Sequence, residues 1–584
     1  MKISEHIVNL LKSFYKSIRR FPVSIALSSS FVIMMIITSE ARPSRSGYVI
    51  QNLERVSMIL ALGFALSLCI KLYFEKKGTN KLYNIIAVSA VSILMLILYY
   101  LFLLKDLSMV STTRYVGISL ALYILFAFIP YLDNREDFEI YIIKIFGRLF
   151  ITIIYSVVLY GGLAAILATI NKLLEVKVPS DFYYYTFLIV AGIFAPTYYL
   201  GGFPSVHDKF TKENYSNIFK VLVLYIVMPL ISIYTIILYI YFAKIIITAK
   251  WPIGLVSHLV LWYSVISAAV LFFISPIYKD NKFADKFMKI LPKAILPLIV
   301  LMFFSVGIRV KAYGITENRY YVIALSLWVF GAMIYFSWSK KFKNIMLPVT
   351  LCIIILISVI GGSISSYSVS KASQNKRLQN ILSANKMLSG NKIIKNSSIP
   401  QNDKNEIRSI LQYFSKSHEL KDIKYLPQNF KMGNMENVFG FSFSETSDSI
   451  DGNFYFNTAQ TDSPIDITGY NYIFDSRNMN YNNYNENESA LRISYDNASH
   501  IFKILNKNDV IYTKKLNDIA KNLVNKYGMT EKQNNIPQSD MLFEEGNSKV
   551  KIKFFIVNMQ GEKNSSTGEI TVNEIDYYVL IKIL

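Results

Sequence analysis

Two loop segments contain the chain's densest combination of basic, aromatic and acidic side chains. Guanidinium and ammonium groups beside aromatic rings can hold a phosphate or a carboxylate, because the planar guanidinium donates paired hydrogen bonds to such anions. A lipid phosphate or an anionic polymer is the ligand that this chemistry predicts. We take the following residues as a candidate functional patch: Lys250, Trp251, Tyr313, Glu317, Arg319 and Tyr320.

The same residues also fit the ordinary end of a membrane helix. Thr316 can cap a helix that starts next to it, and Glu317 complements the dipole of its first turn. Tryptophan and tyrosine are typical of the membrane–water interface. The sequence alone leaves both interpretations open.

One further ionisable group, His258, lies near the middle of an apolar run. It is a candidate intramembrane polar residue, either proton-sensitive or ligand-binding. The alternative is a neutral imidazole that forms a hydrogen bond with a neighbouring helix. Aspartate and glutamate are missing from the depth of the apolar runs, which argues against a proton-coupled transporter.

The polar C-terminal part of the chain contains no recognisable catalytic or metal-binding motif, and His418 and His500 are isolated in the sequence. Cys69 and Cys352 lie in separate apolar runs, and we expect both to be small buried hydrophobic residues. We therefore expect no metal and no cofactor, and a binding or structural role fits better than catalysis.

The elements that must position these residues are membrane helices. Apolar residues make up 53% of the 584 residues, and a bilayer core needs about 20 mostly apolar residues per helix. We predict about eleven spans, near 21–39, 56–74, 83–104, 115–132, 149–170, 182–203, 221–243, 253–276, 293–309, 320–338 and 345–364.

The net charge of +21 reflects topology rather than nucleic-acid binding. Residues 371–584 contain 26 Lys/Arg and 24 Asp/Glu, so the excess belongs to the short loops between apolar runs. With the N-terminus inside, the inner loops carry 23 basic residues and the outer loops 12, which favours a cytoplasmic N-terminus. An odd number of spans then places the C-terminal domain and the candidate patch outside the cell.

The predicted fold class is an all-α polytopic membrane bundle followed by an α+β extracytoplasmic domain. The predicted parts are a cytoplasmic amphipathic helix at 1–20, a multipass domain at 21–366, a helical juxtamembrane segment at 367–430 and a strand-rich domain at 431–584. Strands are expected at 438–444, 453–457, 465–474, 491–495, 500–505, 509–513, 549–557 and 574–584, with a helix near 514–527.

Several separate stretches together resemble the bacterial domain-of-unknown-function family numbered 4153, whose members are multipass membrane proteins. They are Arg20-Phe21-Pro22, the run from Pro229 to Trp251-Pro252, YGITENRYY from Tyr313, SQNKRLQNIL from Ser373 and ITGYNYIF from Ile467. The resemblance implies architecture and a cell-membrane location, and assigns no catalytic residue.

Three functions remain in competition. The leading one is a non-enzymatic cell-envelope protein whose outer domain binds an envelope polymer or a membrane-protein partner, with lipids around its helices and no role for nucleic acid. The second is a transporter or lipid-handling carrier, favoured by the number of spans and by prolines within them. The third is a transferase acting on a lipid-linked substrate at the outer face, which would need a carboxylate such as Asp181 or Glu317.

Overall fold

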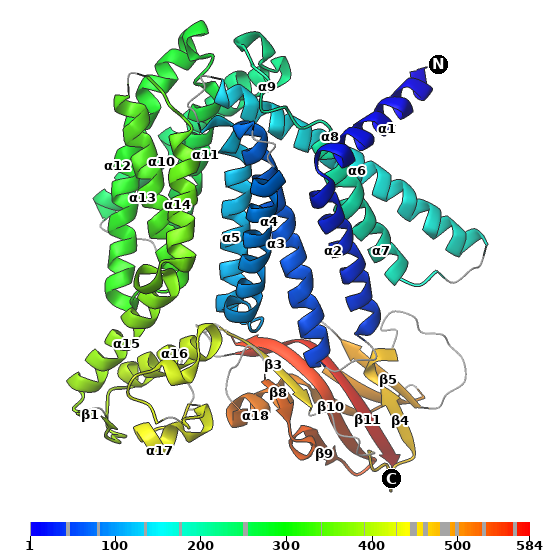
Figure 1. Ribbon diagram of the computed structural model, residues 1–584. Coiled ribbons are helices and arrows are strands. Elements are labelled where there is room, and N and C mark those ends of the chain that lie inside the picture. Colours follow the sequence, from blue (N-terminus) through cyan, green and yellow to red (C-terminus); the bar gives the residue numbers. More distant parts are fainter. Residues whose placement is uncertain are drawn as a thin grey trace. The chain divides into compact units, whose positions relative to one another are not determined.

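The chain folds into two compact units in the computed structural model (Figure 1). The membrane unit is Met1–Asn380 with Tyr413–Lys424, and the C-terminal unit is Ile381–Gln412 with Tyr425–Leu584. The structure describes residues 2–584 except 43–46, 79–81, 133–136, 175–177, 249–254, 340, 391, 428, 444–451, 459–464, 479–490, 497–500, 508, 528–532 and 564–568.

Within these described residues, nine helices are long and apolar enough to cross a membrane. The protein is therefore a multipass membrane protein. The nine are α2 (Pro22–Ala41), α3 (Gly47–Lys77), α4 (Leu82–Leu98) with η1 (Tyr99–Leu103), α5 (Met109–Phe128) with η2 (Ile129–Tyr131), α6 (Phe138–Leu173), α9 (Asn217–Val221) with η5 (Leu222–Val227) and α10 (Met228–Thr248), α11 (Leu255–Ile274), α12 (Lys282–Tyr313) and α13 (Glu317–Trp338).

The two other predicted spans are also helical. One is α7 (Asp181–Ile189), which continues through η3 (Val190–Phe194) into α8 (Ala195–Gly201), and the other is the short apolar α14 (Met346–Ile360). Several helices extend past the predicted apolar windows, because lysine and arginine stems can continue a helix while their charges reach the interface. Thus α6 begins at Phe138 rather than near 149, and α12 begins at Lys282 rather than near 293.

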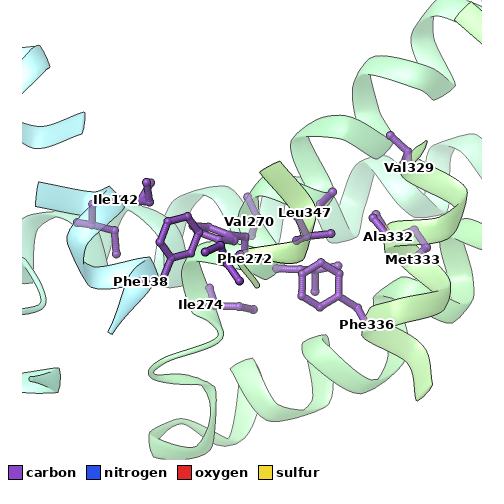
Figure 2. Packing of buried hydrophobic residues seen from close by; sticks show 14 of the residues in the cluster. Phe138, Ile142, Val270, Phe272, Ile274, Val329, Ala332, Met333, Phe336 and Leu347 are labelled. Atoms are coloured by element: carbon purple, nitrogen blue, oxygen red, sulfur yellow. The ribbon is translucent and has the colours of Figure 1, made fainter. Parts of the chain in front are cut away.

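Large side chains and close helix contacts form the core of the membrane unit. Figure 2 shows part of it, where Phe138 of α6, Phe272 of α11 and Phe336 of α13 are buried in one cluster. Small residues allow close approach elsewhere: a Cβ added at Gly117 of α5 would lie 2.6 Å from Val359 of α14. Such small-residue contacts are typical of membrane helices, whose association depends on packing.

A separate helix, α1 (Lys2–Arg20), precedes the first span. Phe21 separates α1 from α2, and Pro22 occupies the first turn of α2. At this position the backbone N–H has no partner within the helix, so proline loses no hydrogen bond. At α8 a Cβ added to Gly201 would lie 2.3 Å from the carbonyl oxygen of Ser13, so α1 and α8 approach each other through this glycine.

The C-terminal unit is a mixture of strands and helices. Its six-stranded sheet has the order β4-β11-β10-β3-β8, with β9 also paired to β10, and a second sheet has the order β5-β6-β7. A two-stranded antiparallel sheet is formed by β1 (Leu388–Ser389) and β2 (Lys392–Ile393). Among the strand pairs of the described residues, only β3–β8 is parallel. The other strands are β3 (Gly452–Thr458), β4 (Tyr472–Asp475), β5 (Leu491–Asp496), β6 (Ile501–Asn506), β7 (Asp509–Lys515), β8 (Gln533–Ile536), β9 (Leu542–Gly546), β10 (Val550–Lys563) and β11 (Ile570–Ile583).

This unit has its own apolar core, formed where α18 (Asn517–Tyr527) and the two sheets contribute buried side chains. The rings of Phe502, Phe554 and Tyr577 meet there at centroid distances of 5.1 to 6.1 Å. Two antiparallel strands of 14 residues each, β10 and β11, supply much of this core because alternate residues along them point inward.

The predicted strand at 438–444 is wrong over the described residues. A short helix, α17 (Met435–Phe439), ends there in Gly440, whose φ of 93° is the left-handed conformation that stops a helix. Of the predicted strand 465–474 only the last part is a strand, β4, and the strands β8 and β9 were not predicted. The helical segment predicted at 367–430 contains α15 (Ser366–Ala384) and α16 (Gln401–Ser417).

Candidate functional site

The loop between α12 and α13 turns sharply at Gly314. This glycine has a φ of 69°, and its N–H bonds the carbonyl of Val310 at 2.9 Å to close the last turn of α12. A Cβ at this position would lie 2.8 Å from the amide nitrogen of Gln374, so the turn also needs glycine for space. Thr316 holds the N-cap position of α13 in extended backbone, but its side chain forms no capping hydrogen bond.

Side chains of helix α15 hold this loop by hydrogen bonds to its backbone. The N–H of Ile315 donates to the Ser373 hydroxyl at 2.8 Å. The amide of Gln374 donates to the carbonyls of Tyr313 and Ile315 at 3.0 and 3.1 Å. The two segments YGITENRYY and SQNKRLQNIL, which are far apart in sequence, therefore form one structural element.

Arg319 and Tyr320 of the predicted patch also bind backbone carbonyls. One nitrogen of Arg319, Nη1, donates to Gly314 at 2.8 Å and to Tyr313 at 3.3 Å. The Tyr320 hydroxyl donates to the carbonyl of Ile364 at 2.7 Å. Both residues fix the end of the bundle, and among the described residues no hydrogen bond from Nε or Nη2 of Arg319 is found.

Glu317 turns away from these residues and is buried, with 9% of its side chain exposed. Its Oε1 accepts from the hydroxyl of Ser370 at 3.0 Å and lies 2.8 Å from Nε2 of His418. The Tyr413 hydroxyl reaches both carboxylate oxygens, at 2.7 and 2.8 Å. We call Glu317, Ser370, Tyr413 and His418 the Glu317 clamp.

Aromatic rings enclose the histidine of the clamp. The His418 ring lies 5.4 Å from the rings of Tyr413 and Phe414 and 5.7 Å from that of Tyr367, and 3% of its side chain is exposed. Burial, together with the hydrogen bond to the Glu317 carboxylate, raises the pKa of Tyr413 far above its ordinary value. Burial raises the pKa of Tyr367 to about 12. Both tyrosines are therefore neutral hydrogen-bond donors at neutral pH.

A second set of bonds holds the segment Tyr413–Lys424 beyond the clamp. Lys371 forms an ion pair with Asp422 at 3.0 Å. The side chain of Asn375 donates to the carbonyl of Asp422 and accepts from the N–H of Lys424, both at 3.0 Å. The segment is thus fastened at two separate places, by Glu317 of α13 and by Lys371 and Asn375 of α15.

A half-buried arginine near the start of the first span forms four hydrogen bonds. Arg20 donates two hydrogen bonds to the Glu75 carboxylate, at 3.1 and 2.9 Å. The same guanidinium donates to the carbonyls of Phe203 and Pro204 at 2.7 and 3.0 Å. Arg20 therefore joins the end of α1 to α3 and to the segment that follows α8. The planar guanidinium suits this role because it has several donors in a fixed geometry.

A family model described as "Domain of unknown function (DUF4153)" matches residues 30–393. The chain belongs to the DUF4153 family. The match includes the loop at Gly314, the helix α13 and the Ser370 and Ser373–Gln374 face of α15, whereas Tyr413 and His418 lie beyond its end.

A comparison with curated proteins also finds a relative. The chain is similar to an uncharacterised protein of Pasteurella multocida (strain Pm70), with 24% identity over 271 residues. This match spans 46% of each protein, so the chain covers about half the length of that relative. No solved structure matches.

The structure separates the predicted patch of this DUF4153 protein. Tyr313, Arg319 and Tyr320 bind the loop and its surroundings, whereas Glu317 points into the clamp. Lys250 and Trp251 lie outside the described residues. Glu317 and Arg319 are two residues apart, and such positions lie on opposite sides of a helix.

The other predicted polar residues lie elsewhere. His258 is exposed on α11, and among the described residues no hydrogen bond to it is found. Asp181 is exposed in the first turn of α7. Neither residue joins the clamp.

Sequence reasoning missed most of the clamp and treated His418 as isolated. Glu317 and His418 are 101 positions apart, so only the fold brings them together. One signal was present in the sequence: Ser366, Ser370 and Gln374 repeat every four residues and form a buried polar stripe on α15. A buried polar stripe on a helix requires polar partners.

Proposed function

We propose that the protein is a non-enzymatic cell-envelope membrane protein that holds its C-terminal unit outside the cell. In this proposal the N-terminus is cytoplasmic, and the C-terminal unit binds an envelope polymer or a membrane-protein partner. The loop bias of 23 to 12 basic residues supports the orientation. Nucleic acid has no part in the proposal, because the excess charge lies in the loops of the membrane unit.

The observation that carries the proposal is the Glu317 clamp. The chain leaves the membrane unit after Asn380, returns at Tyr413, and leaves again after Lys424. Glu317, the first residue of α13, binds this returning segment through Tyr413 and His418. A buried carboxylate is costly unless it is hydrogen-bonded. Here Oε1 lies beside Ser370, Tyr413 and His418, and Oε2 lies beside the Tyr413 hydroxyl. Such contacts favour a permanently attached domain over a domain that is connected only by a flexible linker.

The clamp also bears on the transferase alternative. A general base must lie within hydrogen-bond reach of its substrate. The oxygens of Glu317 are already engaged by Tyr413, Ser370 and His418, and 9% of the side chain is exposed. These contacts support a holding role for Glu317.

A second candidate, a transporter or lipid-handling carrier, is favoured by π-helical turns within apolar helices. They occur at η1, η3 and η5. Single π turns frequently mark functional sites, because they release backbone carbonyls. At η3 the freed carbonyl of Gly192 accepts from the hydroxyl of Ser28 on α2. This hydrogen bond between α2 and η3 explains the π turn as a feature of helix packing. We therefore rank transport second.

The test is an anchor swap in cells. Residues 1–312 would be replaced by an unrelated membrane anchor of matched orientation that leaves α13–α15 and the Glu317 clamp in place, and a photo-crosslinking residue would be placed at Tyr472, which is 46% exposed on β4. If the membrane unit mainly holds the domain, the swapped protein gives the same discrete crosslink and rescues the deletion strain. Loss of rescue at normal abundance and surface display would contradict the proposal and favour transport. A control crosslinker at the partly exposed Lys582 of β11 separates a specific partner from random contacts.

A further inference from the structure

Three polar side chains are buried together in the membrane unit, where three helices begin or end. They are Glu139 in the first turn of α6, Ser275 directly after α11 and Asn344 two residues before α14, and they are 8, 9 and 2% exposed. The amide nitrogen of Asn344, Nδ2, donates to Oε1 of Glu139 and, at 2.7 Å, to the hydroxyl of Ser275. The Ser275 hydroxyl lies 3.4 Å from the same carboxylate oxygen.

The surroundings of this carboxylate are apolar. Figure 2 shows part of them, with Phe138 next to Glu139 in the sequence and Phe272 and Phe336 in the same buried cluster. Among the residues that the structure describes, no ion pair joins Glu139 to a lysine, arginine or histidine. The described surroundings therefore hold a buried negative charge that no positive side chain compensates, and this is costly.

Neighbouring groups do not remove this cost. Asp137, two residues earlier, is close enough for its own negative charge to act on Glu139. The dipole of α6 favours a carboxylate in the first turn of the helix, but this effect is much smaller than the cost of burying an unpaired ion. Ser275 follows the C-terminal end of α11, where the helix dipole is negative.

An unpartnered oxygen is a second, independent sign of a missing positive ligand. Asn344 is almost completely buried, and within the described part of the chain its carbonyl oxygen, Oδ1, has no hydrogen-bond partner. A buried acceptor without a partner is costly. A half-turn of the amide would exchange Oδ1 and Nδ2, and would direct the oxygen to Glu139 and Ser275. The three side chains would then present three oxygen atoms to one point.

We propose that Glu139, Ser275 and Asn344 bind one sodium ion. Oxygen atoms are the ligands that hard cations prefer, and helix ends with a negative dipole supply such sites in membrane proteins. A single carboxylate balances a single positive charge, since Asp137 is engaged by the N–H of Phe210 at 2.7 Å. The proposal goes beyond the holding role, because the ion would join α6, α11 and α14 within the membrane unit. It revises the expectation that no metal is bound.

The experiment uses the full-length protein in a neutral detergent. Radioactive sodium would be bound to protein immobilised on scintillation beads and displaced with unlabelled sodium chloride, while choline chloride keeps the ionic strength constant. Thermal unfolding would be measured in the same two salts at about pH 8, where ordinary carboxyl groups are ionised.

We expect the wild type to bind about one displaceable sodium ion per chain and to melt at a higher temperature in sodium than in choline. Glu139→Gln should lose both effects, although it should fold in choline, because an uncharged amide costs less to bury. Ser275→Ala removes one of the three oxygens and should weaken sodium binding by about tenfold, which decides the matter if Glu139→Gln does not fold. The matched control is Glu213→Gln in η4 (Lys212–Asn214), an exposed position that should behave as the wild type.

Three results would overturn the proposal. The first is a wild type that binds no displaceable sodium and melts at the same temperature in both salts, which would leave a proton as the group that neutralises Glu139. The second is an unchanged affinity for sodium in both Glu139→Gln and Ser275→Ala. The third is an equal loss of binding in Glu213→Gln, which would indicate an effect of general surface charge.

Discussion

Removal of the Tyr413 hydroxyl should release the segment Tyr413–Lys424 without unfolding the bundle. In Tyr413→Phe the ring and its packing remain, but the contacts to both oxygens of Glu317 and to Nε2 of His418 at 2.9 Å disappear. A hydrogen bond to a charged acceptor contributes about 1.5–3 kcal/mol. Since about 1.4 kcal/mol is a factor of ten, we expect amide exchange in the segment to accelerate by about 10- to 100-fold.

The assay is hydrogen exchange of the full-length protein, measured by mass spectrometry. Informative amides are those of His418 and Ile423, which bond the carbonyls of Phe414 and Leu420 at 2.9 and 3.2 Å. Local opening should affect these amides and leave the spans unchanged. Tyr320→Phe is the matched control, because it deletes a hydroxyl from α13 that binds outside the clamp.

A double-mutant cycle with Glu317→Gln shows whether the two residues act together. Glutamine keeps the size of the side chain and one acceptor oxygen, but removes the negative charge. If the clamp is a unit, the two changes are not additive and differ by at least about 0.5 kcal/mol from the sum of the single effects. Additive effects, or acceleration in Tyr413→Phe of less than about threefold, would refute the reasoning.

Three more predictions concern topology, autonomy and pH. Reporter fusions should show an enzyme that works only outside the cell to be active at Leu584 and inactive at Lys77; the reverse pattern would contradict the orientation. A fragment of residues 425–584 should fold cooperatively, because every buried residue of its main core lies within 454–581; a fragment without a cooperative melting transition would contradict this. Hydrogen bonds from Arg477 lower the pKa of Asp475, so the stability that they contribute is present above about pH 4 and is lost as the pH falls through the depressed value. Asp475→Asn should therefore melt at a lower temperature than the parent fragment at pH 7, and the difference should shrink in acid; an unchanged difference would argue against the pair.

The architecture of the bundle was predictable because lipid imposes one simple rule. A segment in a bilayer must satisfy its own backbone, so each long apolar run had to become a helix. The same rule says little about where a helix ends. Helix α12 continues past the predicted end at residue 309, through Lys311 to Tyr313, because charged ends can reach the interface.

The candidate site was only half predictable. Residue type and spacing were enough to select the loop residues Tyr313, Glu317, Arg319 and Tyr320. The structure places them where α12 ends and α13 begins. Their partners did not stand out, because His418 looks isolated in a polar sequence and gains its environment only from the fold. The strand predicted at 438–444 failed for a local reason, since the left-handed Gly440 ends a short helix there.

One turn of α13 explains why these residues can serve two purposes. Successive helical positions are about 100° apart, so Glu317 and Arg319 differ by about 200° and cannot neutralise each other. The carboxylate therefore points into the clamp, where hydroxyl and imidazole groups compensate for its burial. The guanidinium lies on the other side, near two further arginines. Placing the acid at position 319 and the base at 317 would reverse both environments at once, leaving a cation among the donors of the clamp and a carboxylate beside the loop carbonyls. The order of these two charges along the sequence thus allows one helix start to place a carboxylate in the clamp and a guanidinium against the carbonyl of Gly314.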